Sequence, residues 1–99
     1  MLFRSYKAEV MWAKNGKEGV KIVSIRKVDL IIMDLTMPVM DGVKAIKLIK
    51  TSNPQIPIIA VAELVMQAEK IKCLNAGCDA FIDRPIDETE LIGKILQLL

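Results

Sequence analysis

The stretch Val28-Asp29-Leu30-Ile31-Ile32-Met33-Asp34-Leu35-Thr36-Met37-Pro38-Val39-Met40-Asp41-Gly42 decides the fold of this chain. Residues 30–33 are a continuous apolar run, which predicts a strand covered on both faces, as in a parallel sheet. Asp34 follows this run directly, and a loop ending in Asp41-Gly42 comes next. Open α/β sheets bind ligands outside the carboxyl ends of their strands. Asp34 is therefore the first candidate for chemistry.

Strand patterns and helix patterns alternate along the rest of the chain. Strand patterns cover Lys7–Ala13, Val28–Met33, Pro57–Ala62 and Ala80–Asp83, and helical spacing covers Lys17–Arg26, a segment after Gly42, Leu64–Ala76 and a last segment that opens at Asp87. The order is β-α-β-α-β-α-β-α, which favours right-handed βαβ units. The sequence thus predicts an α/β domain with a mainly parallel sheet.

Two helical segments have apolar positions that predict a core-facing side. In the segment after Gly42 the apolar residues recur at spacing three and are Val43, Ile46 and Ile49. The lysines that follow each of them are predicted to face solvent and are Lys44, Lys47 and Lys50. In the last segment a core stripe is predicted, with a second row that widens it: Leu91, Ile95 and Leu98, then Ile92, Leu96 and Leu99. Gly77 is predicted to end the helix before it in a left-handed conformation.

Composition narrows the class of protein. The 99 residues suit one domain, and 53% of them are hydrophobic, so a core is available. The net charge of +2 gives no case for binding nucleic acid. No apolar run approaches the roughly 20 residues of a membrane span, and the amino terminus lacks the pattern of a cleavable signal. We therefore expect a cytoplasmic domain that does not enter a membrane.

The two cysteines, Cys73 and Cys78, lie five residues apart, and the chain contains no histidine. This spacing is not that of a zinc site. Two readings stay open, of which the first is favoured. The cysteines act as small buried apolar side chains in a reducing compartment, or they form a redox pair.

Four runs together resemble the receiver domain of two-component response regulators, most closely the receivers of hybrid sensor histidine kinases. These runs are residues 34–42 (DLTMPVMDG), 57–60 (PIIA), 76–81 (AGCDAF) and 85–86 (PI). The resemblance covers most of the chain, from about residue 10 to residue 98. It implies a flavodoxin-like (CheY-like), three-layer α/β/α domain spanning residues 1–99.

The resemblance also implies a function and a site. Asp34 matches the aspartate that accepts a phosphoryl group from a histidine kinase or phosphotransfer protein, with Mg²⁺ balancing charge. The backbone carbonyl of Thr36 would complete the metal site, and Phe81 matches the aromatic residue that changes rotamer on activation. The output partner would meet the face built from residues 64–99 (Leu64 to Leu99). Such a domain is a signalling module rather than an enzyme.

Three positions depart from the family pattern. The first strand, its acid pair and most of the first helix are missing, and residues 1–6 match only the end of that helix. A hard cation held by one carboxylate and one carbonyl binds weakly.

Ala62 stands where the family has a Thr or Ser hydroxyl that contacts the phosphoryl group. Arg84 stands at the position of the family lysine, and its planar guanidinium is larger than an ammonium. We therefore expect phosphorylation and its readout to be impaired.

Several alternatives stay open. One alternative is a pseudo-receiver that binds partners without phosphorylation, and another is a remnant of a longer gene. A phosphatase of the haloacid dehalogenase type is disfavoured because it needs a second acid where Thr36 stands. A homodimer is compatible with the sequence. Without the missing strand, residues 7–13 and 28–33 pair directly, or another chain fills the gap between them.

Overall fold

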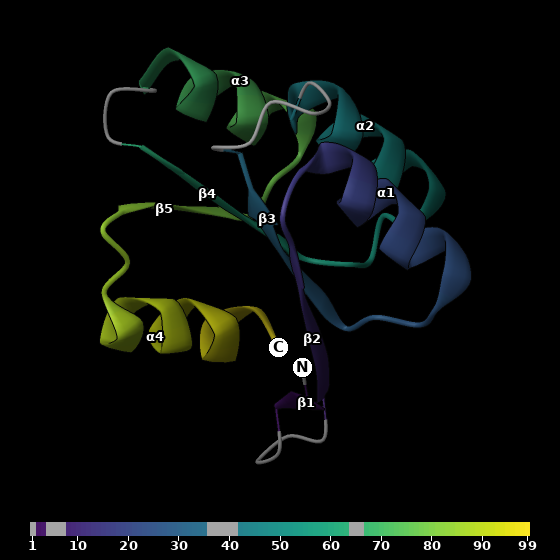
Figure 1. The fold of residues 1–99 in the computed structure, drawn as a ribbon, viewed down its shortest axis with the longest axis horizontal. Helices are drawn as coiled ribbons and strands as arrows, with labels where there is room; N and C mark the ends of the chain where they lie inside the picture. The colour runs from purple at the N-terminus through teal and green to yellow at the C-terminus, as the bar shows by residue number, and fades with distance from the viewer. Residues whose placement is uncertain (1, 4–7, 36–41, 64–66) are drawn as a thin grey trace.

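The computed structural model describes residues 2–3, 8–35, 42–63 and 67–99 of the chain (Figure 1). The strands are β1 (Leu2–Phe3), β2 (Ala8–Ala13), β3 (Leu30–Asp34), β4 (Ile58–Glu63) and β5 (Ala80–Arg84). The helices are α1 (Gly16–Ile25), α2 (Gly42–Ser52), α3 (Gln67–Ala76) and α4 (Glu88–Leu98). The predicted alternation of strands and helices is confirmed from β2 to α4. Residues 64–66, at the start of the helix predicted over Leu64–Ala76, lie outside the described residues.

The sheet has the strand order β1-β2-β3-β4-β5. Strands β2 to β5 are parallel, and β1 is antiparallel to β2. The pairing of β2 with β3 is direct, from Val10 opposite Leu30 to Ala13 opposite Met33. Of the two predicted arrangements of these strands, direct pairing is therefore the one observed.

The expectation that residues 1–6 match the end of a helix is wrong for Leu2 and Phe3. These two residues form β1 and pair with Glu9 and Ala8 of β2. A strand at the edge of a sheet exposes unpaired N–H and C=O groups, and an added strand pairs them. This pairing is a tertiary contact that the local sequence pattern did not contain.

The described helices lie in two layers around the sheet. Helices α1, α2 and α3 cover one face, and α4 covers the other (Figure 1). The reason is that right-handed crossovers between sequential neighbouring strands always place the connecting helix on the same side. Helix α4 follows the last strand and so is free to cover the opposite face.

Each face of the sheet has its own core. The cluster under α1, α2 and α3 includes Ile31, Met33, Ile46, Ala60, Ala62, Cys73 and Phe81. The cluster under α4 includes Val10, Leu30, Ile32, Val61, Ile82 and Ile95. Because successive residues of a strand point to opposite faces, β3 supplies both clusters and is buried along its whole length. This is the strand that the apolar run at residues 30–33 predicts.

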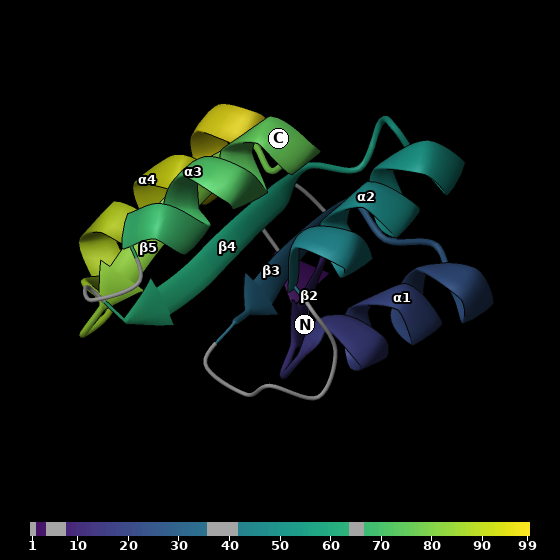
Figure 2. The same cartoon turned by 90° about the horizontal axis from the view of Figure 1, so that it is seen from above.

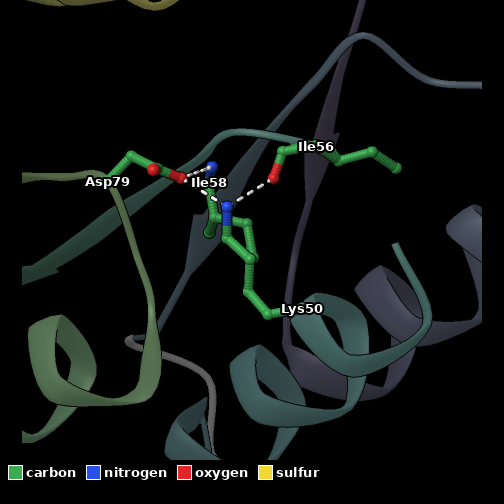
Figure 3. Close-up of polar contacts among 4 residues, drawn as sticks. All are labelled: Lys50, Ile56, Ile58 and Asp79. Atoms are coloured by element: carbon green, nitrogen blue, oxygen red, sulfur yellow. Dashed lines mark hydrogen bonds and ion pairs between the residues drawn. The ribbon is translucent and has the colours of Figure 1, made fainter. Parts of the chain in front are cut away.

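Two details of the predicted helix faces are wrong. The second row of α4 is exposed rather than part of the core, since Ile92 is 39% and Leu96 40% accessible. Lys50 does not face away from the protein: its Nζ donates to Ile56 O and Asp79 Oδ2, both at 2.8 Å (Figure 3). The reach of a lysine side chain allows it to bury its methylene stem and still find polar partners.

The contacts of Lys50 belong to a polar clamp formed by Lys50, Ile56, Ile58 and Asp79. Asp79 Oδ2 also accepts a hydrogen bond from Ile58 N at 2.8 Å, and Asp79 N donates to Ile58 O at 2.8 Å. The clamp therefore ties the end of α2 and the start of β4 to the turn between α3 and β5 (Figure 3). It lies at the amino ends of the strands, which is the edge of the sheet opposite Asp34.

Candidate functional site

Asp34 is the last residue of β3, at the carboxyl end of a strand buried along its length. It is the one buried polar or charged residue among the described positions, with 7% of its surface exposed. It lies opposite Val61 of β4, and the next residue, Leu35, donates its N–H to Val61 O at 2.8 Å. The backbone around Asp34 is thus held by the sheet, and the carboxylate occupies the edge where the sequence predicts the site.

Arg84, the last residue of β5, reaches Asp34 from two strands away. Its Nη2 donates to Asp34 Oδ2, forming an ion pair whose side chains are 33% and 10% exposed, respectively. Asp34 and Arg84 share a face because alternation places both on the α4 side, with Ile32 and Ile82. The Nε of Arg84 is buried and has no hydrogen-bond partner. The peptide bond between Arg84 and Pro85 is cis.

Ala62 and Phe81 lie on the other side of the sheet, in the core under α3. Ala62 is fully buried and Phe81 is 8% exposed, and both belong to the same apolar cluster. The Nζ of Lys70, from α3, lies 5.5 Å from the centroid of the Phe81 ring. The methyl of Ala62 has no donor to offer an oxyanion. The structure therefore brings Asp34 to Arg84 and Ala62 to Phe81, on opposite faces of the sheet.

Asp83, in β5, carries a polar atom that is buried beside the site. It lies opposite Ala62 in the β4–β5 register, and its Oδ1 is buried without a hydrogen-bond partner. The signal in the sequence was its position two residues after Phe81, because residues i and i+2 of a strand point to the same face. Strand alternation alone thus predicts that Asp83 points to the α3 side.

The residues present fit a divalent metal ion poorly. Among the described residues, no group of three or more His, Cys, Asp and Glu side chains is placed to hold an ion. The carboxylate of Asp34 already contacts the guanidinium of Arg84. Mg²⁺ requires near-octahedral oxygen coordination, and this site offers one carboxylate that is paired with a cation. Thr36, the predicted carbonyl ligand, lies outside the described residues.

The fold and the site together define a class of protein. It is a mainly parallel α/β domain that presents the buried carboxylate of Asp34 at the carboxyl edge of its sheet, beside a cation from the last strand.

Comparison with known proteins identifies the family. The model of the response regulator receiver domain matches residues 1–96, and the chain belongs to this family. It is 42% identical over 82 residues to hybrid signal transduction histidine kinase G of Dictyostelium discoideum, covering 80% of this chain and 2% of that protein. It is 36% identical over 83 residues to the chemotaxis protein CheY of Thermotoga maritima, covering 84% of this chain and 69% of that protein.

Solved structures agree with this assignment. The signal receiver domain of a signal transduction histidine kinase from Syntrophus aciditrophicus superposes with a TM-score of 0.79 at 26% identity, covering 93% of this chain and 89% of that one. The predicted flavodoxin-like receiver fold, of the CheY type, is therefore confirmed. The chain spans 2%, 6% and 4% of the length of three histidine kinases that it matches, so those proteins contain much more than this domain.

Among the described residues, no helix is both long enough and apolar enough to cross a bilayer.

Proposed function

We propose that this domain accepts a phosphoryl group on Asp34 in a two-component phosphorelay, with a histidine kinase or a phosphotransfer protein as donor. The observation that carries the proposal is the ion pair between Asp34 and Arg84 at the carboxyl edge of the sheet. Membership of the receiver family supports the same role. We propose that residues 1–99 form one receiver domain.

The transfer follows from the charges at the site. An oxygen of the Asp34 carboxylate attacks the phosphorus, the new O–P bond forms as the bond from phosphorus to the donor histidine nitrogen breaks, and the histidine keeps the electron pair. Arg84 already contacts Asp34, and a guanidinium binds phosphoryl oxygens in a two-pronged geometry. Its charge offsets part of the charge that the phosphoryl group adds. We propose that the domain binds Mg²⁺ weakly, because Asp34 is already paired.

The readout of phosphorylation is proposed to be weak. In the family pattern a hydroxyl at position 62 links the phosphoryl group to the aromatic residue at position 81. Here the buried side chain is the methyl of Ala62. Phe81 is already packed in the core cluster, so phosphorylation at Asp34 has no hydrogen bond with which to move it.

The output partner is proposed to bind the face formed by α3, β5 and α4. Figure 2 shows α3 and α4 lying along the β5 edge of the sheet, one on each side of it. Each helix carries exposed apolar side chains: Ile71 is 63% and Leu74 43% accessible on α3, and Ile92 is 39% accessible on α4. Exposed apolar side chains on neighbouring elements are typical of a binding surface. A homodimer through this face is one form of the proposal.

The test is to incubate the domain with a small phosphodonor such as acetyl phosphate, with and without Mg²⁺, and to measure its intact mass. We expect the mass to rise by one phosphoryl group, and Asp34→Asn to abolish the rise. Asp83→Asn is the matched control, because it removes a carboxylate from the opposite face of the sheet and should leave the rise intact. No rise in the parent chain under either condition would refute the proposal.

The second candidate is a pseudo-receiver that binds its partner without phosphorylation. The specific observation in its favour is that Arg84 occupies the acceptor carboxylate while Ala62 lacks the hydroxyl of the switch. Under this alternative, Asp34→Asn binds a captured partner as tightly as the parent chain does, with or without the phosphodonor.

A further inference from the structure

The carboxyl end of α3 is a Schellman motif, the turn in which a helix ends on a residue with positive φ. Gly77 has φ +119°, its N–H donates to Leu74 O at 3.1 Å, and the N–H of Cys78 donates to Cys73 O at 3.1 Å. These are the two hydrogen bonds that define the motif. The second hydrogen bond spans more residues than the first, and it joins Cys78 to Cys73.

In a Schellman motif, an apolar contact between the side chains at these two positions is frequent. The backbone hydrogen bond between Cys78 and Cys73, with the covalent lengths on each side of it, limits their Cα–Cα separation to at most about 7 Å. Disulfides need a Cα–Cα separation of about 4.4–6.8 Å. Both cysteines are reduced thiols of the same apolar cluster, at 0% and 6% exposure. The turn therefore holds two thiols within reach of one disulfide.

The turn is closed in the resting fold by the polar clamp. Asp79, the residue after Cys78, is held by Ile58 N and by Lys50 Nζ, both at 2.8 Å (Figure 3). Burial, with Cys73 and Asp79 nearby, raises the pKa of the Cys78 thiol to about 12, although Lys50 lowers it in part. A neutral thiol is a poor nucleophile, so the closed turn protects the pair.

We propose that Cys73 and Cys78 are a dithiol site that a small disulfide of the glutathione class oxidises to an intramolecular disulfide when the clamp opens. Cys78 lies nearer the surface and reacts first: its sulfur attacks one sulfur of the oxidant, a mixed disulfide forms, and one thiolate leaves. Cys73 then attacks the sulfur of Cys78, and the second thiolate leaves. The two protons released by the cysteines pass to the two leaving thiolates. The protein loses two electrons and the oxidant gains them.

The disulfide would join the last turn of α3 to the residue that leads into β5. It would fix the turn that the clamp now holds. The strand β5, which carries Phe81 and Arg84, begins two residues after Cys78. The site lies at the amino edge of the sheet, away from Asp34. It therefore stands or falls independently of phosphorylation.

The test uses the folded chain and glutathione disulfide, followed by intact mass under non-reducing conditions. We expect loss of two hydrogens with no retained glutathione, and reversal by a dithiol reductant. Cys73→Ser should instead retain one glutathione on Cys78, because the resolving thiol is gone. Lys50→Met should speed the reaction at least several-fold, and Asp79→Ala should do the same because it removes the acceptor of the Ile58 N–H.

Three outcomes would overturn the proposal. One is a retained glutathione in the parent chain, and another is a disulfide between two chains. The third is no reaction of the folded chain over a period in which the same chain in guanidinium oxidises completely. The comparison in guanidinium is made on the parent sequence, so the result does not depend on whether any variant folds.

Discussion

The guanidinium of Arg84 is paired with the carboxylate of Asp34 although a whole strand, β4, lies between their own strands. The two residues are 50 positions apart in the chain and meet because both end parallel strands at the same edge of the sheet. The pair both holds the buried carboxylate and sets a positive charge beside the proposed acceptor oxygen. Both the stability of the fold and the proposed function are expected to depend on this ion pair.

Removing the cation should destabilise the fold. Arg84→Met leaves the carboxylate of Asp34 buried without its guanidinium, and we expect a loss of about 1–3 kcal/mol in the free energy of unfolding, reduced from the fully buried case because Arg84 is partly exposed. Urea unfolding followed by circular dichroism measures it. Arg84→Lys keeps the charge and should lose less. An Arg84→Met variant as stable as the parent would show that the pair adds nothing.

Restoring the hydroxyl of the family switch should restore the link to Phe81. Ala62→Ser places a donor at the buried position, and in the presence of a phosphodonor we expect the ring resonances of Phe81 to shift, which they do not in the parent chain. The added atom costs about 1 kcal/mol of stability because the site is fully packed. Ala62→Val adds volume without a donor and is the control. Equal shifts in both variants would argue against a hydroxyl link.

The polar clamp should be visible in stability. Lys50→Met removes the ammonium from Asp79 Oδ2 and from Ile56 O, and we expect a loss of about 1–2 kcal/mol in urea unfolding. The control is Lys47→Met, on the exposed side of the same helix, where the change should stay within about 0.5 kcal/mol. If both substitutions have the same small effect, the clamp contributes no more than a surface lysine.

Gly77 and Gly93 should respond in opposite directions to the same substitution. At Gly77 the φ of +119° is a conformation that alanine rarely adopts, and a Cβ would meet Lys50 Cγ at 3.1 Å. We expect Gly77→Ala to destabilise by about 1 kcal/mol or more. A Cβ at Gly93 meets nothing within 4 Å, so Gly93→Ala should stabilise α4 by roughly 0.5–1 kcal/mol. Thermal unfolding of the two variants tests both signs.

The reactivity of Cys78 should depend on pH in a direction set by its environment. Its pKa is raised from 9.0 to about 12 by burial first, then by Cys73 and Asp79, while Lys50 acts in the opposite direction. The folded state therefore holds the proton more tightly than the unfolded state between pH 9 and 12, and stability falls as pH rises through that window. Alkylation of the folded chain by iodoacetamide should keep rising above pH 9 instead of levelling off as an ordinary thiol does. A plateau near pH 9 would contradict a raised pKa of Cys78 in the folded chain.

Much of this domain is predictable from local pattern. The apolar run at residues 30–33 predicts the strand that is buried throughout, and Gly77 predicts the positive φ that ends α3. The runs at residues 34–42 and 76–81 predict the family. Each of these features depends on residues that are close together in the chain, so a short segment of sequence is enough to predict it.

Other features depend on elements that only the fold brings together. Nothing local indicates that Arg84 reaches Asp34 rather than solvent, that Lys50 turns inward to Asp79, or that Leu2 and Phe3 add a strand to β2. The row of Ile92 and Leu96 has the same apolar character as the core row beside it, yet it is exposed, because α4 packs on the sheet along one stripe only.

The sequence by itself therefore determined the α/β class, the order of the strands and helices, and the family with its candidate acceptor at Asp34. The tertiary structure decided which charges meet and which strands pair directly. The physical reason is the separation of the interacting residues along the chain. Hydrophobic periodicity and turn preferences act over a few residues, whereas ion pairs and strand registers join residues that only packing brings together.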